Sequence, residues 1–84
     1  MYWCYCEVLL GEEEVSKIEE MLREKWHAEE VVVSSYKDGW KISFLIDDYK
    51  KIFVFFDIIK QYRGEIVDRP RYGKVDVPRA RSCD

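Results

Sequence analysis

The fold is decided by the stretch EVVVSSYKDGWKISFLI, residues 30–46. Both of its ends are rich in β-branched and aromatic residues, which favour strands. Between them lies Lys37-Asp38-Gly39, and an Asp-Gly pair readily supplies the positive φ angles of a tight hairpin turn. The stretch therefore predicts two antiparallel strands, residues 30–36 and 40–46, joined by that turn.

The turn also predicts which residues face each other across the hairpin. With Asp38 and Gly39 as the turn residues, Val33 pairs with Phe44, and this face of the hairpin is apolar enough to be core. The other face mixes apolar and polar side chains, namely Val32, Ser34, Tyr36, Lys41, Ser43 and Leu45.

Before the hairpin, the sequence predicts a strand and then a helix. Residues 2–10 are mostly aromatic, branched or small apolar residues, and Gly11 ends the run. Glu12–Glu14 then suit the positive end of a helix that starts there. Because apolar residues recur at spacings of three and four from Val15 to Trp26, we expect an amphipathic helix of about 16 residues.

After the hairpin, residues 47–63 predict a second helix that is apolar on more than one side. Asp47 is a good N-cap, and Arg63-Gly64 is a good C-terminal stop. The run Ile52–Phe56 is also compatible with a buried strand, but the helical spacing and the end signals favour the helix. Residues 65–68 then predict a short final strand.

The predicted order, β-α-β-β-α-β, is that of the ferredoxin-like fold, a four-stranded antiparallel sheet with two helices on one face. We expect a single α+β domain over residues 1–68 and a basic C-terminal tail or edge extension over residues 69–84. The alternation of Lys74-Val75-Asp76-Val77 would suit an added edge strand, and the other interpretation is a loose tail. A chain of 84 residues is long enough for one domain only. Its hydrophobic content of 48% excludes a disordered chain.

The composition predicts a cytoplasmic protein from a hot environment. The chain has no Asn or Thr and one Gln, whereas charged residues make up 37%. Few thermolabile amides beside many charges are typical of thermophile proteins. No apolar run approaches the roughly 18 residues needed to span a bilayer, and no basic-then-apolar leader opens the chain. We therefore expect no membrane association.

Charge is unevenly distributed along the chain. Residues 1–59 hold 7 Lys and Arg against 13 Asp and Glu, a net −6, whereas residues 60–84 hold 7 against 4, a net +3. The basic residues of the tail are candidate contacts for nucleic acid or an acidic partner: Arg69, Arg71, Lys74, Arg79 and Arg81. The alternative, which we favour, is that they fold back onto the acidic body to which they are tethered.

With both helices on one side, the other side of the sheet is predicted to be bare. On the first strand Glu7 would be costly beneath the helices without a partner. We therefore expect Cys4, Cys6, Val8 and Leu10 to face the helices. The predicted interface on the bare side consists of Trp3, Tyr5, Leu9, Val32, Tyr36 and Leu45. Apolar patches of this size usually mark an interaction surface.

Three interpretations of this patch compete. We favour a homodimer that packs these faces together or joins strand edges, because symmetric homodimers are the commonest oligomers. The second is a single-stranded nucleic-acid-binding module that stacks bases on Trp3 and Tyr5. It is less favoured, because Trp40 and Phe44 of the third strand point to the core and the body is acidic. The third is a monomer with scattered surface aromatics.

No set of residues predicts catalytic or metal chemistry. Cys4 and Cys6 are about 6.6 Å apart along one strand and belong to no C-x-x-C pair, so small core residues are favoured over a zinc site with Cys83 and His27. A disulfide from Cys83 is the minor alternative. His27 has no nucleophile positioned beside it. We expect no cofactor, no metal and no catalytic residue, and a non-enzymatic interaction or regulatory domain.

Overall fold

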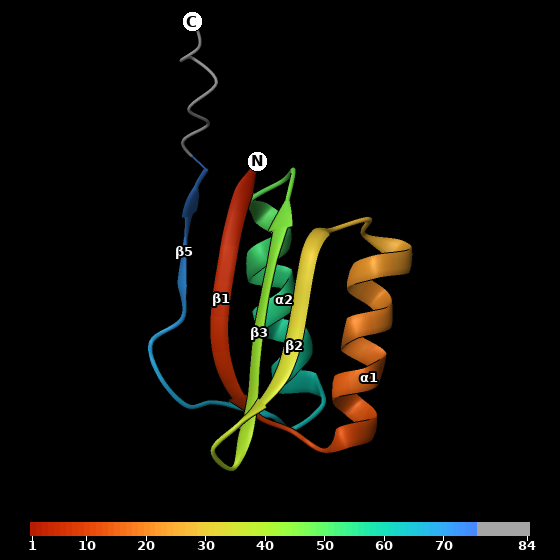
Figure 1. Ribbon diagram of the computed structural model, residues 1–84, viewed down its shortest axis with the longest axis vertical. Helices are drawn as coiled ribbons and strands as arrows, with labels where there is room; N and C mark the ends of the chain where they lie inside the picture. The colour runs from red at the N-terminus through yellow and green to blue at the C-terminus, as the bar shows by residue number, and fades with distance from the viewer. Residues whose placement is uncertain (76–84) are drawn as a thin grey trace, which may run out of the picture.

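The structure, a computed structural model, describes residues 1–75 and has the chain order β-α-β-β-α-β followed by one further strand. The elements are β1 (Tyr2–Leu9), α1 (Glu12–Glu20) with a π-helical continuation η1 (Met21–Lys25), β2 (Glu29–Tyr36), β3 (Gly39–Ile46), α2 (Lys50–Gln61), β4 (Glu65–Ile66) and β5 (Arg71–Lys74) (Figure 1). The prediction of an α+β domain with two helices is confirmed.

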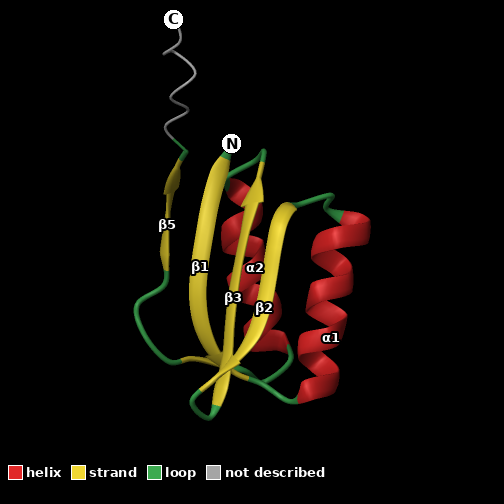
Figure 2. Ribbon diagram, viewed as in Figure 1, coloured by secondary structure: helices red, strands yellow, loops and turns green. Residues whose placement is uncertain are grey.

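The strands form one antiparallel sheet in the order β2-β3-β1-β4, and β5 also pairs with β1. The short strands β4 and β5 share one edge of β1: β4 pairs at Val8 and Leu9, and β5 pairs from Tyr2 to Tyr5. In Figure 2 α2 passes behind the strands, α1 lies beside β2, and no helix crosses the front surface of the sheet. Residues of both helices pack in the same core, on the other side of the sheet. The described chain is therefore a two-layer structure with one uncovered sheet surface.

The core lies between the sheet and the helices. It is built from alternate residues of β1, from the apolar side of β3 and from one stripe of each helix, since these positions face the same layer. Its fully buried members include Cys4, Cys6, Val8, Ile18, Leu22, Ile42, Phe44, Ile52, Phe55 and Ile59. Phe44 and Phe55 meet edge to face with ring centroids 5.0 Å apart, which joins β3 to α2.

The hairpin turn differs from the prediction. Lys37 and Asp38 form the turn, Lys37 alone of the loop residues takes a positive φ, of 56°, and Gly39 is the first residue of β3. Val33 consequently pairs with Ile42, not with Phe44. Because the register has moved by two residues and side chains alternate with period two, each residue keeps its predicted face.

Gly39 has a steric role that explains this register. A Cβ atom at this position would overlap the carbonyl oxygen of Val8 on the neighbouring strand. Glycine is therefore required where β3 passes close to β1, and its freedom to adopt a positive φ is not used. The Asp-Gly turn rule fails here because close packing between strands governs the position.

The outer edge strand β2 contains an irregularity between Glu29 and Val32, where the pairing with β3 shifts. Glu30 within it has a φ of 50°. A bulge of this kind twists an edge strand and interferes with pairing to another chain. Edge-to-edge association through β2 is therefore disfavoured.

The second helix begins later than predicted. Asp48, and not Asp47, accepts the backbone N–H of Lys50 through its side chain, at 3.0 Å. The first helix contains the predicted apolar stripe, and its last turn is π-helical. Within residues 1–75, neither helix has the length and apolarity needed to cross a membrane.

Candidate interaction surface on the open face of the sheet

Alternation along β1 defines the surface that we call the open face. Cys4, Cys6 and Val8 are buried against the helices, so the residues between them point to the opposite side of the sheet. The open face comprises Trp3, Tyr5, Glu7 and Leu9 of β1, Val32, Ser34 and Tyr36 of β2, Lys41, Ser43 and Leu45 of β3, and Arg71 and Gly73 of β5. All six residues predicted to form the interface lie on it.

One end of the open face is an apolar surface formed around Trp3. Leu45 is the cross-strand neighbour of Trp3 on β3, and Gly73 is its neighbour on β5. The indole lies against Gly73, because a Cβ atom there would stand 3.2 Å from Trp3 Nε1. The side chain remains 37% exposed, and among residues 1–75 its N–H has no acceptor within hydrogen-bonding distance. This end can accept both apolar and hydrogen-bonding contacts.

The centre of the open face is polar, and two of its side chains are hydrogen-bonded to each other. The Tyr5 hydroxyl donates a hydrogen bond of 3.0 Å to Glu7 Oε2, and Lys41 is the cross-strand neighbour of Glu7. Partial desolvation, the hydrogen bond to Glu7 and the charge of Glu7 together raise the pKa of Tyr5. The single carboxylate of β1 thus has one hydrogen-bond donor, the Tyr5 hydroxyl, which lowers the cost of covering it.

The other end of the open face is an aromatic–cation cluster. The amino groups of Lys41 and Lys37 lie 5.0 Å and 5.1 Å from the centroid of the Tyr36 ring, within the range of cation–π attraction. Leu9 stands nearby on β1 and is 38% exposed. The aliphatic stems of the two lysines add apolar surface to this end.

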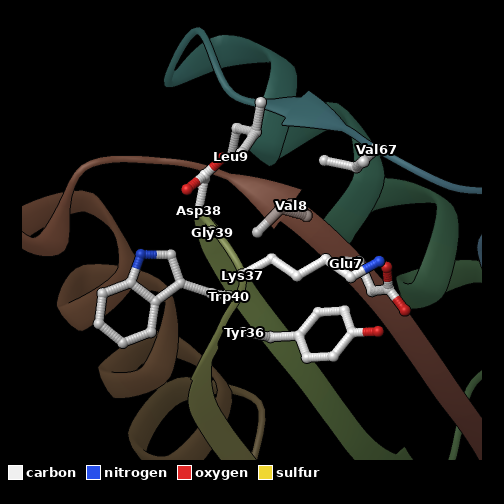
Figure 3. A pocket seen from close by; sticks show the side chains of 9 residues that line it. All are labelled: Glu7, Val8, Leu9, Tyr36, Lys37, Asp38, Gly39, Trp40 and Val67. Atoms are coloured by element: carbon white, nitrogen blue, oxygen red, sulfur yellow. The ribbon is translucent and has the colours of Figure 1, made fainter.

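A shallow hollow of about 180 Å³ lies at this end, beside the hairpin turn (Figure 3). Its lining comes from β1, the hairpin and the residue after β4: Glu7, Val8, Leu9, Tyr36, Lys37, Asp38, Gly39, Trp40 and Val67. The missing side chain at Gly39 helps to leave the space open. The described residues that line this hollow include no Ser, Cys, Thr or His.

The added edge strand β5 lies earlier in the chain than the edge strand that the sequence offered. Arg71, expected in a tail, pairs opposite Tyr5 and so lies at the margin of the open face. Lys74 and the exposed Arg69 lie on or just before the same strand. Arg79 and Arg81 fall outside the described residues. The only signal for β5 was a possible edge strand at residues 74–77, and the observed strand precedes most of that stretch.

A second group of exposed aromatics lies on the helix side of β5. Tyr72 packs edge to face on Phe53 of α2, with centroids 5.3 Å apart, and Tyr49 and Tyr2 extend the same cluster. Phe56 also faces Tyr72 at 6.1 Å. The apolar second side of α2 that the sequence predicts is therefore partly covered by β5, which lies in the stretch predicted as a tail or edge extension.

Cys4 and Cys6 lie in the core, and His27 lies on the surface. Cys4 and Cys6 are free thiols, and burial raises both pKa values, that of Cys4 to about 12. His27 is exposed and has a φ of 54° where the chain leaves η1 for β2. In the part of the chain that the structure describes, no three His, Cys, Asp or Glu side chains are grouped as metal ligands. Cys83 lies outside that part.

No protein-family model matches this chain, and no curated protein matches its sequence significantly.

Proposed function

We propose that this chain is a non-enzymatic homodimeric domain, serving in protein interaction or regulation, in which two copies pack open face against open face. The observation that carries the proposal is the exposure of large apolar side chains on a sheet surface without helices. Trp3, Leu9 and Val32 are 37%, 38% and 53% exposed, and large apolar side chains gathered on one face of a small domain favour an interaction surface.

The proposal includes the ferredoxin-like arrangement of the domain. The strand order β2-β3-β1-β4 supports it, because the order places the third strand between the first and second and the first between the third and fourth. Connections of this kind leave both helices on one side. The open face is then a consequence of the topology.

The size of the open face suits a dimer. Four strand positions at about 4.8 Å and eight residues at about 3.4 Å give a surface of roughly 500 Å² per copy. Two copies would cover roughly 1,000 Å² in projection, which reaches the lower bound for a specific interface. Two sheets packed face to face keep their strands within about 30° of each other.

The charges on the open face also suit a second copy. The Glu7 carboxylate accepts the Tyr5 hydroxyl, and Lys41 lies opposite Glu7 on β3. The open face therefore carries groups of opposite charge that two copies can present to each other. A twofold-symmetric interface needs such self-complementarity.

A matched pair of valine substitutions tests this proposal. Val32 on the open face is 53% exposed and Val54 on α2 is 47% exposed. We expect Val32→Glu to weaken dimerisation at least about tenfold, because a charge would be buried without a partner, and Val54→Glu to change it less than about twofold. Sedimentation equilibrium of both variants measures the effect.

Equal dissociation constants for the two variants would refute the open face as the dimer interface. Circular dichroism of each variant serves as the control for folding. If Val32→Glu does not fold, Leu45→Lys replaces it. Leu45 lies on the same face, in the central strand β3.

A second candidate is a single-stranded nucleic-acid-binding module. The observation in its favour is the pairing of Arg71 with Tyr5, which adds a cation to the aromatic surface around Trp3. Bases stack on aromatic rings while cations bind the phosphates. The absence of an exposed aromatic on β3, whose open-face residues are Lys41, Ser43 and Leu45, favours the dimer over this alternative.

Binding to labelled oligo-dT and oligo-U distinguishes the two. The nucleic-acid candidate predicts salt-dependent binding that Trp3→Ala weakens about tenfold or more. No binding at low salt would eliminate it. Binding that survives Trp3→Ala would place the contact elsewhere on the chain.

A further inference from the structure

The free edge of β5 has a backbone hydrogen-bonding pattern that the structure defines. Val75 donates its N–H to the Met1 carbonyl at 3.0 Å, and Met1 and Val75 are consecutive with the antiparallel pair Tyr2–Lys74. In an antiparallel ladder, pairs that exchange hydrogen bonds alternate with pairs that do not. Gly73 therefore bonds to Trp3, whereas the N–H and C=O groups of Tyr72 and Lys74 point away from β1.

These outward groups have no partner among residues 1–75. Among these residues β5 pairs with β1 alone, and no hydrogen bond outside the sheet engages the N–H of Tyr72 or Lys74. No bulge interrupts the four consecutive pairs between β1 and β5, in contrast to β2 at the opposite edge. An exposed regular edge can be extended by an added strand.

An aromatic surface lies beside this edge on the helix side. Tyr72, Phe53 and Tyr49 are 46%, 44% and 49% exposed, and their rings are in contact through Phe53. A strand added to β5 would bring a side chain opposite Tyr72 to within about 5 Å between Cβ atoms. An apolar side chain there would cover the exposed part of this cluster.

The charge around the edge selects the kind of strand. Arg69, Arg71 and Lys74 are exposed, and none forms an ion pair with another residue of the described range. A second copy pairing β5 with β5 would bring these cations together, and like charges across a ladder are unfavourable. An acidic segment would instead be attracted.

We propose that the free edge of β5 binds an extended, acidic peptide segment of another protein by strand addition, with an apolar side chain of the peptide on the Tyr72–Phe53 cluster. This site lies at the sheet edge, and the inference does not depend on the open-face dimer. The chemistry expected of the segment is an alternation of carboxylate and apolar side chains, since successive side chains of a strand point to opposite faces.

The experiment uses the full chain and a fluorescein-labelled hexapeptide of alternating glutamate and valine with one central phenylalanine. Lys74→Pro removes one outward N–H without removing a bond to β1, and proline is tolerated at such edge positions. Lys74→Ala removes the same charge but keeps the N–H. Fluorescence anisotropy gives the affinities, and circular dichroism checks that each variant folds.

We expect Lys74→Pro to weaken binding about five- to tenfold beyond Lys74→Ala, the loss of one hydrogen bond plus the clash of the ring with the peptide. Two further peptides are N-methylated at alternate residues, one at the odd and one at the even positions. One of them should lose binding and the other should keep it, because only every second peptide N–H faces β5. Three results would overturn the proposal. They are an equal loss of peptide affinity in the two Lys74 variants, no binding of the peptide at millimolar concentration, and a Lys74→Pro variant that changes the oligomeric mass but not the peptide affinity.

Discussion

Gly39 illustrates how a single residue sets the register of this sheet. Its position beside Val8 leaves no room for a Cβ atom, so the residue after the turn must be glycine for β3 to approach β1. Lys37 takes the positive φ that the sequence assigned to the Asp-Gly pair. The cost of that conformation in a lysine is smaller than the cost of separating two central strands.

The substitution Gly39→Ala is therefore expected to lower the free energy of unfolding by about 1–3 kcal/mol, as overpacking does in a rigid interior. Gly11→Ala is the control. A Cβ atom at Gly11 would meet only the carboxylate end of the Glu14 side chain, which can swing away, and the φ of −70° suits alanine. Urea unfolding of both variants measures the difference, and equal losses would contradict the steric role of Gly39.

The two buried thiols predict a loss of stability in alkali. Burial raises the pKa of Cys4 from 9.0 to about 12 and raises that of Cys6 as well. Because the folded pKa lies above the unfolded value, the unfolded chain loses these protons first as the pH rises above 9.0. Each thiol then lowers the free energy of unfolding by up to about 1.4 kcal/mol per pH unit.

The measurement is the free energy of unfolding between pH 8 and 11 for the natural chain and for the double variant Cys4→Ala, Cys6→Ala, in reducing buffer. The double variant should show the flatter dependence on pH, because both chains share all other titrating groups. Parallel curves would contradict the burial of the thiols.

At the scale of elements, α2 has two apolar sides with different partners. Phe55 is fully buried against Phe44, whereas the neighbouring Phe53 is 44% exposed and contacts Tyr72 of β5. The sequence could predict the helix and its second apolar side, because the spacing repeats with the helical period. It could not predict what covers that side.

We expect Phe55→Ala to destabilise the protein by about 3–5 kcal/mol, the usual cost of removing a buried aromatic ring. Phe53→Ala should cost about 1 kcal/mol, the worth of an exposed aromatic pair. Thermal or denaturant unfolding distinguishes the two. Similar losses would mean that the aromatic cluster at β5 is as tightly packed as the core.

The strand β5 marks where sequence reasoning stops. Its four residues, Arg71–Lys74, contain one glycine and two basic residues and show no apolar alternation, so nothing local predicts a strand. They pair with β1 because β4 covers only Val8 and Leu9 of that edge. Tyr72 also gains contact with α2. These contacts join residues that are far apart in the sequence, and a local sequence pattern does not predict them.

The two faces of β1 could be predicted, because one carboxylate decides between them. Burying Glu7 beneath the helices would be costly, and the structure places it on the side away from them, where it accepts the Tyr5 hydroxyl. The pairing partners across the sheet, by contrast, depended on the turn and shifted by two residues. Face is a property of alternation, whereas register depends on contacts between strands.

At the scale of the whole molecule, one surface of the sheet is left without a helix. Two helices serve one side of the sheet, and the other presents Trp3, Leu9 and Val32 to solvent. A chain of this size buries only about 60% of the surface that it exposes when unfolded. A second copy on the open face would add the apolar contact that the thin core lacks.

The most direct measurement is the mass of the native chain in solution, by light scattering during size-exclusion chromatography from micromolar to millimolar concentration. The open-face dimer predicts a mass of about twice 10.2 kDa, which falls to the monomer value in Val32→Glu and not in Val54→Glu. A natural chain that stays at 10.2 kDa across the whole range would contradict the open-face dimer.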